Sequence, residues 1–134
     1  MPVTIEQWIK RRSAAAVSAG LGEWVDYPNT AFGKPIYRLA DGPVRFVFSE
    51  WGFIYDGPPA SFECRYDETE CLKLAPLREI IPRDGDMISR CKHSRLLTLS
   101  VIKCGDQRPL EMRFSLAVYN QVATILPHIV DNLA

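Results

Sequence analysis

Apolar and polar residues alternate in several short runs in the middle of this chain, and this pattern constrains the fold more than any other feature. The alternation is clearest in residues 97–102 and 110–114, which a stretch containing Gly105 and Pro109 separates. Successive side chains of a strand point to opposite faces of a sheet, so each run predicts a strand with one buried face. Together the two runs predict an antiparallel hairpin with a loop of four to six residues.

Earlier runs show the same period of two. Residues 44–48, 53–55 and 62–66 alternate in this way, and residues 36–39 favour a further short strand. The sequence Asp-Gly-Pro-Pro at residues 56–59 predicts a turn, because Asp-Gly tolerates a positive φ and proline ends a strand ladder. A further aliphatic stretch, residues 72–81, ends at a predicted turn over residues 82–86. Strands in an uninterrupted series indicate an antiparallel sheet rather than βαβ units.

A helix is predicted at the start of the chain. Thr4 and Gln7 have the spacing of a capping box, with Val3 and Trp8 placed as a hydrophobic staple. Apolar residues then recur at helical spacing over residues 5–19, and glycines follow. The sequence therefore predicts an N-terminal amphipathic helix over about residues 5–19.

A second amphipathic helix is predicted at the end of the chain, with Ser115 as its N-cap residue. Pro127 lies within this helix and lacks a backbone donor, so we expect a kink there. The apolar residues of the predicted helix are spaced by three or four, as one buried face requires: Tyr119, Val122, Leu126, Ile129 and Leu133.

These elements predict a single α+β domain over residues 1–134. A curved antiparallel sheet of about six or seven strands carries a helix at each end of the chain. The expected divisions are a helical segment over 1–22, a connecting loop over 23–43, the sheet over 44–114 and the last helix over 115–134.

Composition excludes some classes of function. The chain has 134 residues, with 16 Lys and Arg against 16 Asp and Glu, and this zero net charge argues against a dedicated nucleic-acid binder. We find no apolar run of the roughly 20 residues that span a bilayer, so a membrane partner is not expected. The first twelve residues lack the apolar region of a signal peptide, and we expect a cytoplasmic protein.

Cys64, Cys71, Cys91 and Cys104 have spacings that match no zinc motif. We expect free and mostly buried thiols in a reducing compartment, with two disulfides as the alternative that the even count leaves open. The sequence also lacks the phosphate-binding glycine motifs and the Gly-x-Ser-x-Gly nucleophile motif. We therefore expect no cofactor, no metal and no catalytic residues.

The order of strands followed by one amphipathic helix resembles the pleckstrin-homology-like superfold, including its GRAM-type relatives. The similarity is carried by residues 46–55, which read Phe-Val-Phe-Ser-Glu-Trp-Gly-Phe-Ile-Tyr, by residues 62–77 and by residues 96–133. The chain departs from that family in its additional first helix and in its first hairpin loop, which carries Glu50 instead of a basic cluster. The resemblance implies a lipid-binding or membrane-surface module as an alternative function. Arg90, Lys92 and Arg95 would then supply its basic pocket.

Charge is segregated along the chain. Residues 50–70 hold six acidic residues and one basic residue, whereas residues 83–113 hold seven basic and four acidic residues. Opposite patches of this kind suit a protein partner of complementary potential. The alternative is that the two segments pair with each other across the sheet.

Three aromatic residues, Trp51, Tyr55 and Tyr66, lie next to predicted turns or strand ends, where we expect exposed interface anchors; Trp8 and Trp24 are expected in the core. The leading hypothesis is a small cytosolic non-enzymatic protein-binding domain, in its concrete form a bacterial immunity or adaptor protein that neutralises a toxin or effector. An enzyme whose site is assembled from distant residues is a third option.

The candidate partner-binding residues are Glu50, Trp51, Tyr55, Glu63, Tyr66, Asp67, Glu68, Glu70, Arg90, Lys92 and Arg95.

Overall fold

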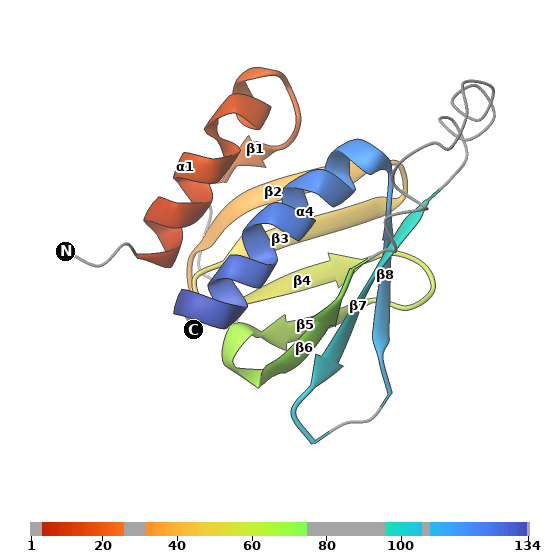
Figure 1. The fold of residues 1–134 in the computed structure, drawn as a ribbon. Coiled ribbons are helices and arrows are strands. Elements are labelled where there is room, and N and C mark those ends of the chain that lie inside the picture. Colours follow the sequence, from red (N-terminus) through yellow and green to blue (C-terminus); the bar gives the residue numbers. More distant parts are fainter. Residues whose placement is uncertain (1–3, 26–31, 75–95, 106–107, 134) are drawn as a thin grey trace, which may run out of the picture.

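The computed structural model of the chain describes residues 4–25, 32–74, 96–105 and 108–133. Within these ranges two α-helices accompany eight strands (Figure 1). The elements are α1 (Ile5–Ser18), β1 (Glu23–Trp24), β2 (Pro35–Asp41), β3 (Val44–Ser49), β4 (Gly52–Asp56), β5 (Phe62–Arg65), the 3-10 turn η1 (Tyr66–Glu68), β6 (Thr69–Lys73), β7 (Leu97–Lys103), β8 (Leu110–Phe114), α4 (Leu116–His128) and the π-helical turn η2 (Ile129–Leu133).

Several sequence expectations lie outside the described residues. They concern Val3 of the hydrophobic staple, the aliphatic residues 77, 80 and 81, the turn over 82–86, Cys91, and the basic residues Arg90, Lys92 and Arg95.

The described strands form two antiparallel sheets. Sheet A has the order β1-β2-β3-β4-β5, and sheet B has the order β6-β7-β8. The expected α+β class, the antiparallel pairing and the two flanking helices are confirmed. The expected hairpin is also confirmed as β7 and β8, with Leu99 opposite Met112. The expected single sheet is divided into two.

The division occurs at η1, where the chain turns a corner. Thr69, the first residue of β6, is buried, and its hydroxyl lies 3.3 Å from the thiol of Cys64 and donates to the carbonyl of Arg65 at 3.2 Å. Beyond β7, the amide of Cys104 donates to the carbonyl of Glu68 at 2.7 Å. These bonds stabilise the turn at η1. The strand expected over 62–66 therefore ends one residue earlier, at Arg65, and the next strand begins at Thr69.

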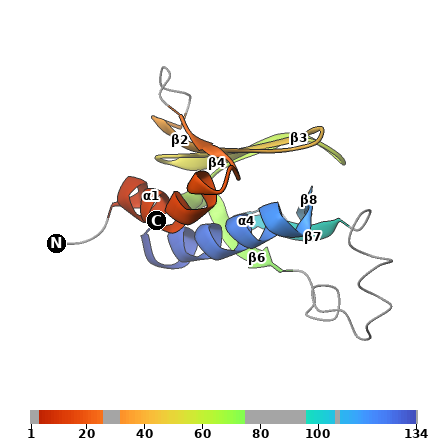
Figure 2. The same cartoon turned by 90° about the horizontal axis from the view of Figure 1, so that it is seen from above.

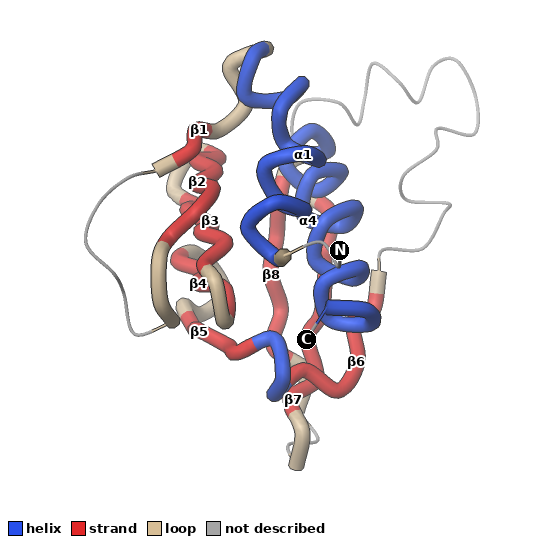
Figure 3. The backbone as a smooth tube through the Cα atoms, turned by 90° about the vertical axis from the view of Figure 1, so that its left-hand side faces the viewer, coloured by secondary structure: helices blue, strands red, loops and turns tan. Residues whose placement is uncertain are grey.

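Sheet A forms one layer of the molecule, and sheet B with the helices lies against one face of it (Figures 2 and 3). Helix α1 contacts β2 and α4, while α4 also contacts β7 and β8. In both views no described element covers the other face of sheet A. With respect to the described elements, sheet A therefore has one covered face and one open face.

Aromatic side chains from the inner face of sheet A fill the space between the layers. The ring centroid of Phe46 lies 5.4 Å from that of Phe53 and 5.8 Å from that of Phe114 on β8. The helix α4 adds Val122 and Ile125, which are fully buried. Burying one such side chain stabilises the fold by roughly 1.5–3 kcal/mol, so the inward-facing residues of the strands and of α4 both contribute to stability.

The first helix begins as its sequence predicts. The hydroxyl of Thr4 accepts a hydrogen bond from the amide of Gln7 at 3.1 Å, and the amide of Thr4 donates to the side-chain carbonyl of Gln7 at 3.1 Å. The capping box is therefore confirmed. Gly20 follows the helix with a φ of +89°, a conformation that glycine adopts without a steric cost.

The last helix departs from the expectation for its N-cap residue. Ser115 is the N-cap residue, but its side chain makes no capping bond, and its amide donates to Asp41 at 2.7 Å instead. The α-helix also continues past Pro127 to His128 and then widens into η2. The π-helical turn begins two residues after Pro127, and the kink expected at Pro127 stays a prediction.

Two expectations about residues 23–43 are wrong. The short strand expected over residues 36–39 is confirmed within β2, but the rest of the range is not only a connecting loop, because β1 and both ends of β2 also belong to sheet A. Trp24 is not a core residue either, since 44% of it is exposed. It lies on a two-residue edge strand opposite Tyr37, and its ring nitrogen donates to the hydroxyl of Ser13 at 2.8 Å while the ammonium of Lys10 lies 5.8 Å from its ring centroid. Trp8 is buried as expected.

Candidate protein-binding surface

One of the three aromatic residues expected at the surface is exposed. Trp51 is 54% exposed, whereas Tyr55 and Tyr66 are 0% and 2% exposed, so the interpretation of these tyrosines as interface anchors is wrong. Tyr55 lies opposite Phe46 on the inner face of sheet A. Tyr66 turns inward at the corner, where its hydroxyl donates to the carbonyl of Ser49 at 2.7 Å. In both cases a hydrogen bond satisfies the buried hydroxyl, which allows these residues to serve the core.

The backbone of Trp51 is held from two sides. Its amide donates to the carbonyl of Phe32 at 3.0 Å, and its carbonyl accepts from the amide of Tyr66 at 3.0 Å. The next residue is Gly52, where a Cβ atom would lie 2.5 Å from the carbonyl oxygen of Cys64. Only glycine fits this close approach of β4 to β5. The turn between β3 and β4 therefore presents the indole to solvent on a fixed backbone.

Glu50 supports this turn instead of forming part of the exposed surface. One of its carboxylate oxygens accepts a hydrogen bond from the amide of Lys34 at 2.7 Å, and the side chain is half-buried. Gly33 packs against it with a φ of +85°. We therefore assign Glu50 a positioning role beside Trp51.

Exposed charge lies on β5 and η1, whose backbone pairs with the residues around Trp51. Arg65 is opposite Gly52 in the register, and Glu63 lies two residues earlier on the same face of β5. Arg65 donates to both carboxylate oxygens of Asp67 at 3.1 Å, which lowers the pKa of Asp67 and raises the pKa of Arg65. Both side chains are exposed. We call Trp51, Glu63, Arg65 and Asp67 the Trp51 surface.

The open face of sheet A carries Glu63 and Arg65 of this surface. The register places Arg38, Val47, Ile54 and Glu63 opposite one another in a row across β2, β3, β4 and β5. Val47 and Ile54 are half-buried by their neighbours. A narrow apolar strip between charged residues therefore runs from β3 and β4 to Glu63.

Among the described residues, one ion pair joins the acidic segment to the basic segment. Lys103 lies 3.6 Å from Glu68 and links the two segments, whereas Asp67 pairs with Arg65 of its own segment. Glu63 and Glu70 are exposed and form no ion pair among the residues that the structure describes. Some of the acidic charge is thus displayed to solvent. Arg90, Lys92 and Arg95 lie outside the described part of the chain, so a basic pocket stays a prediction.

The described cysteines are free thiols in two environments. Cys64 is buried, and burial raises its pKa, whereas Cys71 and Cys104 are exposed. The expectation of mostly buried thiols is therefore wrong for Cys71 and Cys104. Cys71 is on the edge strand β6, and Cys104 is in the loop after β7, so neither position is covered by the other sheet.

Groups of His, Cys, Asp or Glu that could hold a metal ion are not found among residues 4–25, 32–74, 96–105 and 108–133. Over the same residues, neither α1 nor α4 has the length and apolar character to cross a membrane. Neither a known protein family, nor a curated protein sequence, nor a solved structure matches this chain. The resemblance to the pleckstrin-homology-like superfold therefore stays a prediction.

Proposed function

We propose that this chain is a small protein-binding domain and that the Trp51 surface contacts its partner. The observation that carries this proposal is the 54% exposed indole of Trp51 on a backbone fixed by hydrogen bonds to Phe32 and Tyr66. Tryptophan is enriched among the residues that contribute most to protein interfaces. A preorganised backbone also reduces the entropy that is lost on binding.

The charge beside Trp51 indicates the chemistry of the partner. Glu63 is exposed without an ion pair among the described residues, whereas Asp67 is already paired with Arg65, so Glu63 supplies the negative charge that a partner can contact. A partner that places a lysine or arginine next to an apolar pocket for the indole would complement this arrangement. Charge of this kind chiefly increases the association rate and selects against acidic partners.

In its finer form, the proposal is that the chain is a bacterial immunity or adaptor protein that neutralises an effector in the cytoplasm. Segregated charge and an exposed Trp51 on a fixed backbone suit such a role. A protein that blocks an effector must bind it tightly but does not need catalytic residues. The finer proposal predicts that the partner is a toxin or effector with a basic contact surface.

The test is quantitative capture of partners from a lysate of the native organism by the immobilised chain, with mass spectrometry as the readout. Trp51→Ala should lose the stoichiometric partner. Leu116→Ala is the matched control, because Leu116 is 48% exposed at the start of α4, outside the Trp51 surface. A partner retained by both variants, or lost by both, would contradict the assignment of Trp51.

A further inference from the structure

Among the described residues, the strand β6 has an unpaired edge. It pairs with β7 on one side and with no described strand on the other. The opposite edge of sheet B is engaged, because the amide of Arg113 on β8 donates to the hydroxyl of Tyr55 in sheet A. Most of β6 is exposed, and Leu74 just beyond it is exposed as well. An open strand edge of this kind is a ready template for another strand.

A bulge limits the regular part of this edge. The register shifts between Thr69 and Cys71, so Glu70 has no partner on β7 and Cys71, Leu72 and Lys73 follow in regular pairing. A bulge of this kind leaves the extra residue unpaired and changes the direction of its side chain. Glu70 accordingly lies at one end of a short regular edge.

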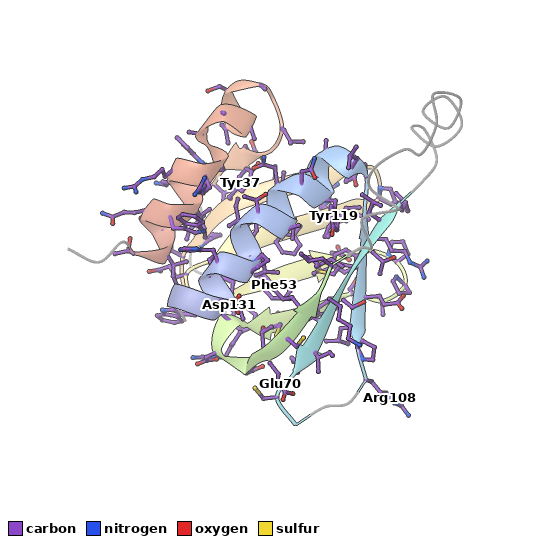
Figure 4. All side chains as sticks on the ribbon, in the orientation of Figure 1. Tyr37, Phe53, Glu70, Arg108, Tyr119 and Asp131 are labelled. Atoms are coloured by element: carbon purple, nitrogen blue, oxygen red, sulfur yellow. The ribbon has the colours of Figure 1, made fainter. Side chains whose placement is uncertain are left out.

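A groove of about 350 Å³ runs beside this edge, where β6 faces the end of α4 and η2. Leu72, Leu74 and Pro127 supply apolar lining, while Glu70 and Asp131 supply two carboxylates, and none of the lining residues that the structure describes is a lysine or an arginine. Figure 4 shows Glu70 and Asp131 at the same end of the molecule. The volume is within the range of roughly 300–1,000 Å³ typical of ligand sites, and it accommodates a few side chains.

We propose that the β6 edge and this groove bind an extended basic segment of a partner protein by strand addition. Main-chain hydrogen bonds to β6 provide affinity, and pockets for alternate side chains provide selectivity. An apolar side chain of the segment packs on Leu72 and Leu74, and flanking lysines or arginines pair with Glu70 and Asp131. This site is formed by elements other than those of the Trp51 surface, and it does not depend on that surface.

The probe is a fluorescein-labelled heptapeptide that alternates lysine with leucine or valine, titrated with the full chain and followed by fluorescence anisotropy. We expect saturable binding and slower amide hydrogen exchange at Cys71, Leu72 and Lys73 in the complex. Methylation of alternate peptide nitrogens removes donors without changing charge, and it should weaken binding at least tenfold. A peptide with glutamate in place of lysine should not bind.

On the protein side, the double variant E70Q/D131N should bind the peptide at least tenfold more weakly. The control E23Q/E111Q removes two other exposed carboxylates and should bind like the wild type. If the methylated and unmethylated peptides bind with equal affinity, the peptide binds through charge alone, and strand addition is overturned. The proposal is also overturned by unaltered affinity in E70Q/D131N, by no binding, or by self-association through β6. The peptide does not bind through the Trp51 surface. A peptide that fails to bind therefore overturns the β6 proposal and does not affect the capture experiment that tests the Trp51 surface.

Discussion

The hydroxyl of Tyr55 accepts a hydrogen bond from the backbone amide of Arg113 at 3.1 Å, joining β4 of sheet A to the edge strand β8 of sheet B. The same hydroxyl donates to the carbonyl of Pro58. One buried side chain thus closes the edge of sheet B and fixes the turn after β4. This relationship explains why Tyr55 is in the core although its sequence neighbours predict a turn.

Tyr55→Phe should destabilise the fold by about 1–2 kcal/mol, because the amide of Arg113 and the carbonyl of Pro58 lose their partner. Urea unfolding measures this loss as a lower midpoint with an unchanged slope. Hydrogen exchange at the Arg113 amide should accelerate, while the Ser115 amide, bonded to Asp41, stays protected. An unchanged midpoint together with unchanged exchange at Arg113 would contradict the proposed role of this bond.

Thr4→Ala should destabilise the fold by about 1 kcal/mol, because it removes the side chain that accepts from the Gln7 amide. Thr4→Ser keeps the oxygen and should retain most of the stability. Thermal unfolding of the two variants under the same conditions measures the difference. Equal midpoints for alanine and serine would show that the capping box contributes little here.

Stability should fall in alkaline solution between about pH 10 and pH 12. Burial raises the pKa of Tyr37 from 10.0 to about 12, and burial also raises the pKa of Tyr66. The unfolded chain therefore releases these protons first, and each tyrosine's stabilisation is complete below pH 10 and lost as pH rises toward its folded-state pKa.

Tyr37 alone should contribute roughly 1–3 kcal/mol of this loss by pH 12. Urea midpoints at pH 9 and pH 11.5 measure the effect, and tyrosine absorbance near 295 nm follows the ionisation. Tyr37→Phe should lose less stability than the wild type between pH 9 and pH 11.5. Its stability at pH 9 should be lower than that of the wild type, because it lacks the hydrogen bond from the Tyr37 hydroxyl to the Leu21 carbonyl. Ionisation of every tyrosine near pH 10 in the folded protein would contradict the burial.

Alkylation should distinguish the described thiols. Iodoacetamide at pH 8 should modify the exposed Cys71 and Cys104 in the folded chain, and should reach the buried Cys64 only after unfolding in urea. Burial blocks access to Cys64 and raises its pKa, which lowers the fraction of reactive thiolate. Peptide mapping by mass spectrometry assigns each site. Rapid modification of Cys64 in the folded protein would place it outside the core.

Local patterns in the sequence predicted most of the elements. The Thr4 capping box, the strands around Phe46 and Phe114 and the last helix follow from spacing, because each depends on neighbours along the chain. The sequence did not predict the strand that begins at Thr69, since acidic residues at its start are typical of a turn. It could not predict the division into two sheets either, because the corner at η1 depends on contacts between distant residues.

The candidate site was predicted less well. Trp51 and Glu63 are exposed as expected, but alternation alone does not show which face of a strand another layer covers, so Tyr55 and Tyr66 were misplaced. Asp131, which lines the groove beside Glu70, belongs to η2 far along the chain. Only the packing of η2 near β6 brings these two carboxylates together, and no local signal in the sequence indicates it.

The central claim is that Trp51 anchors a protein partner. The most direct measurement is the dissociation constant of the captured partner for the wild type, Trp51→Ala and Leu116→Ala, by isothermal titration calorimetry. We predict that Trp51→Ala weakens binding at least tenfold, about 1.4 kcal/mol or more, while Leu116→Ala matches the wild type. Wild-type affinity in Trp51→Ala would contradict the claim.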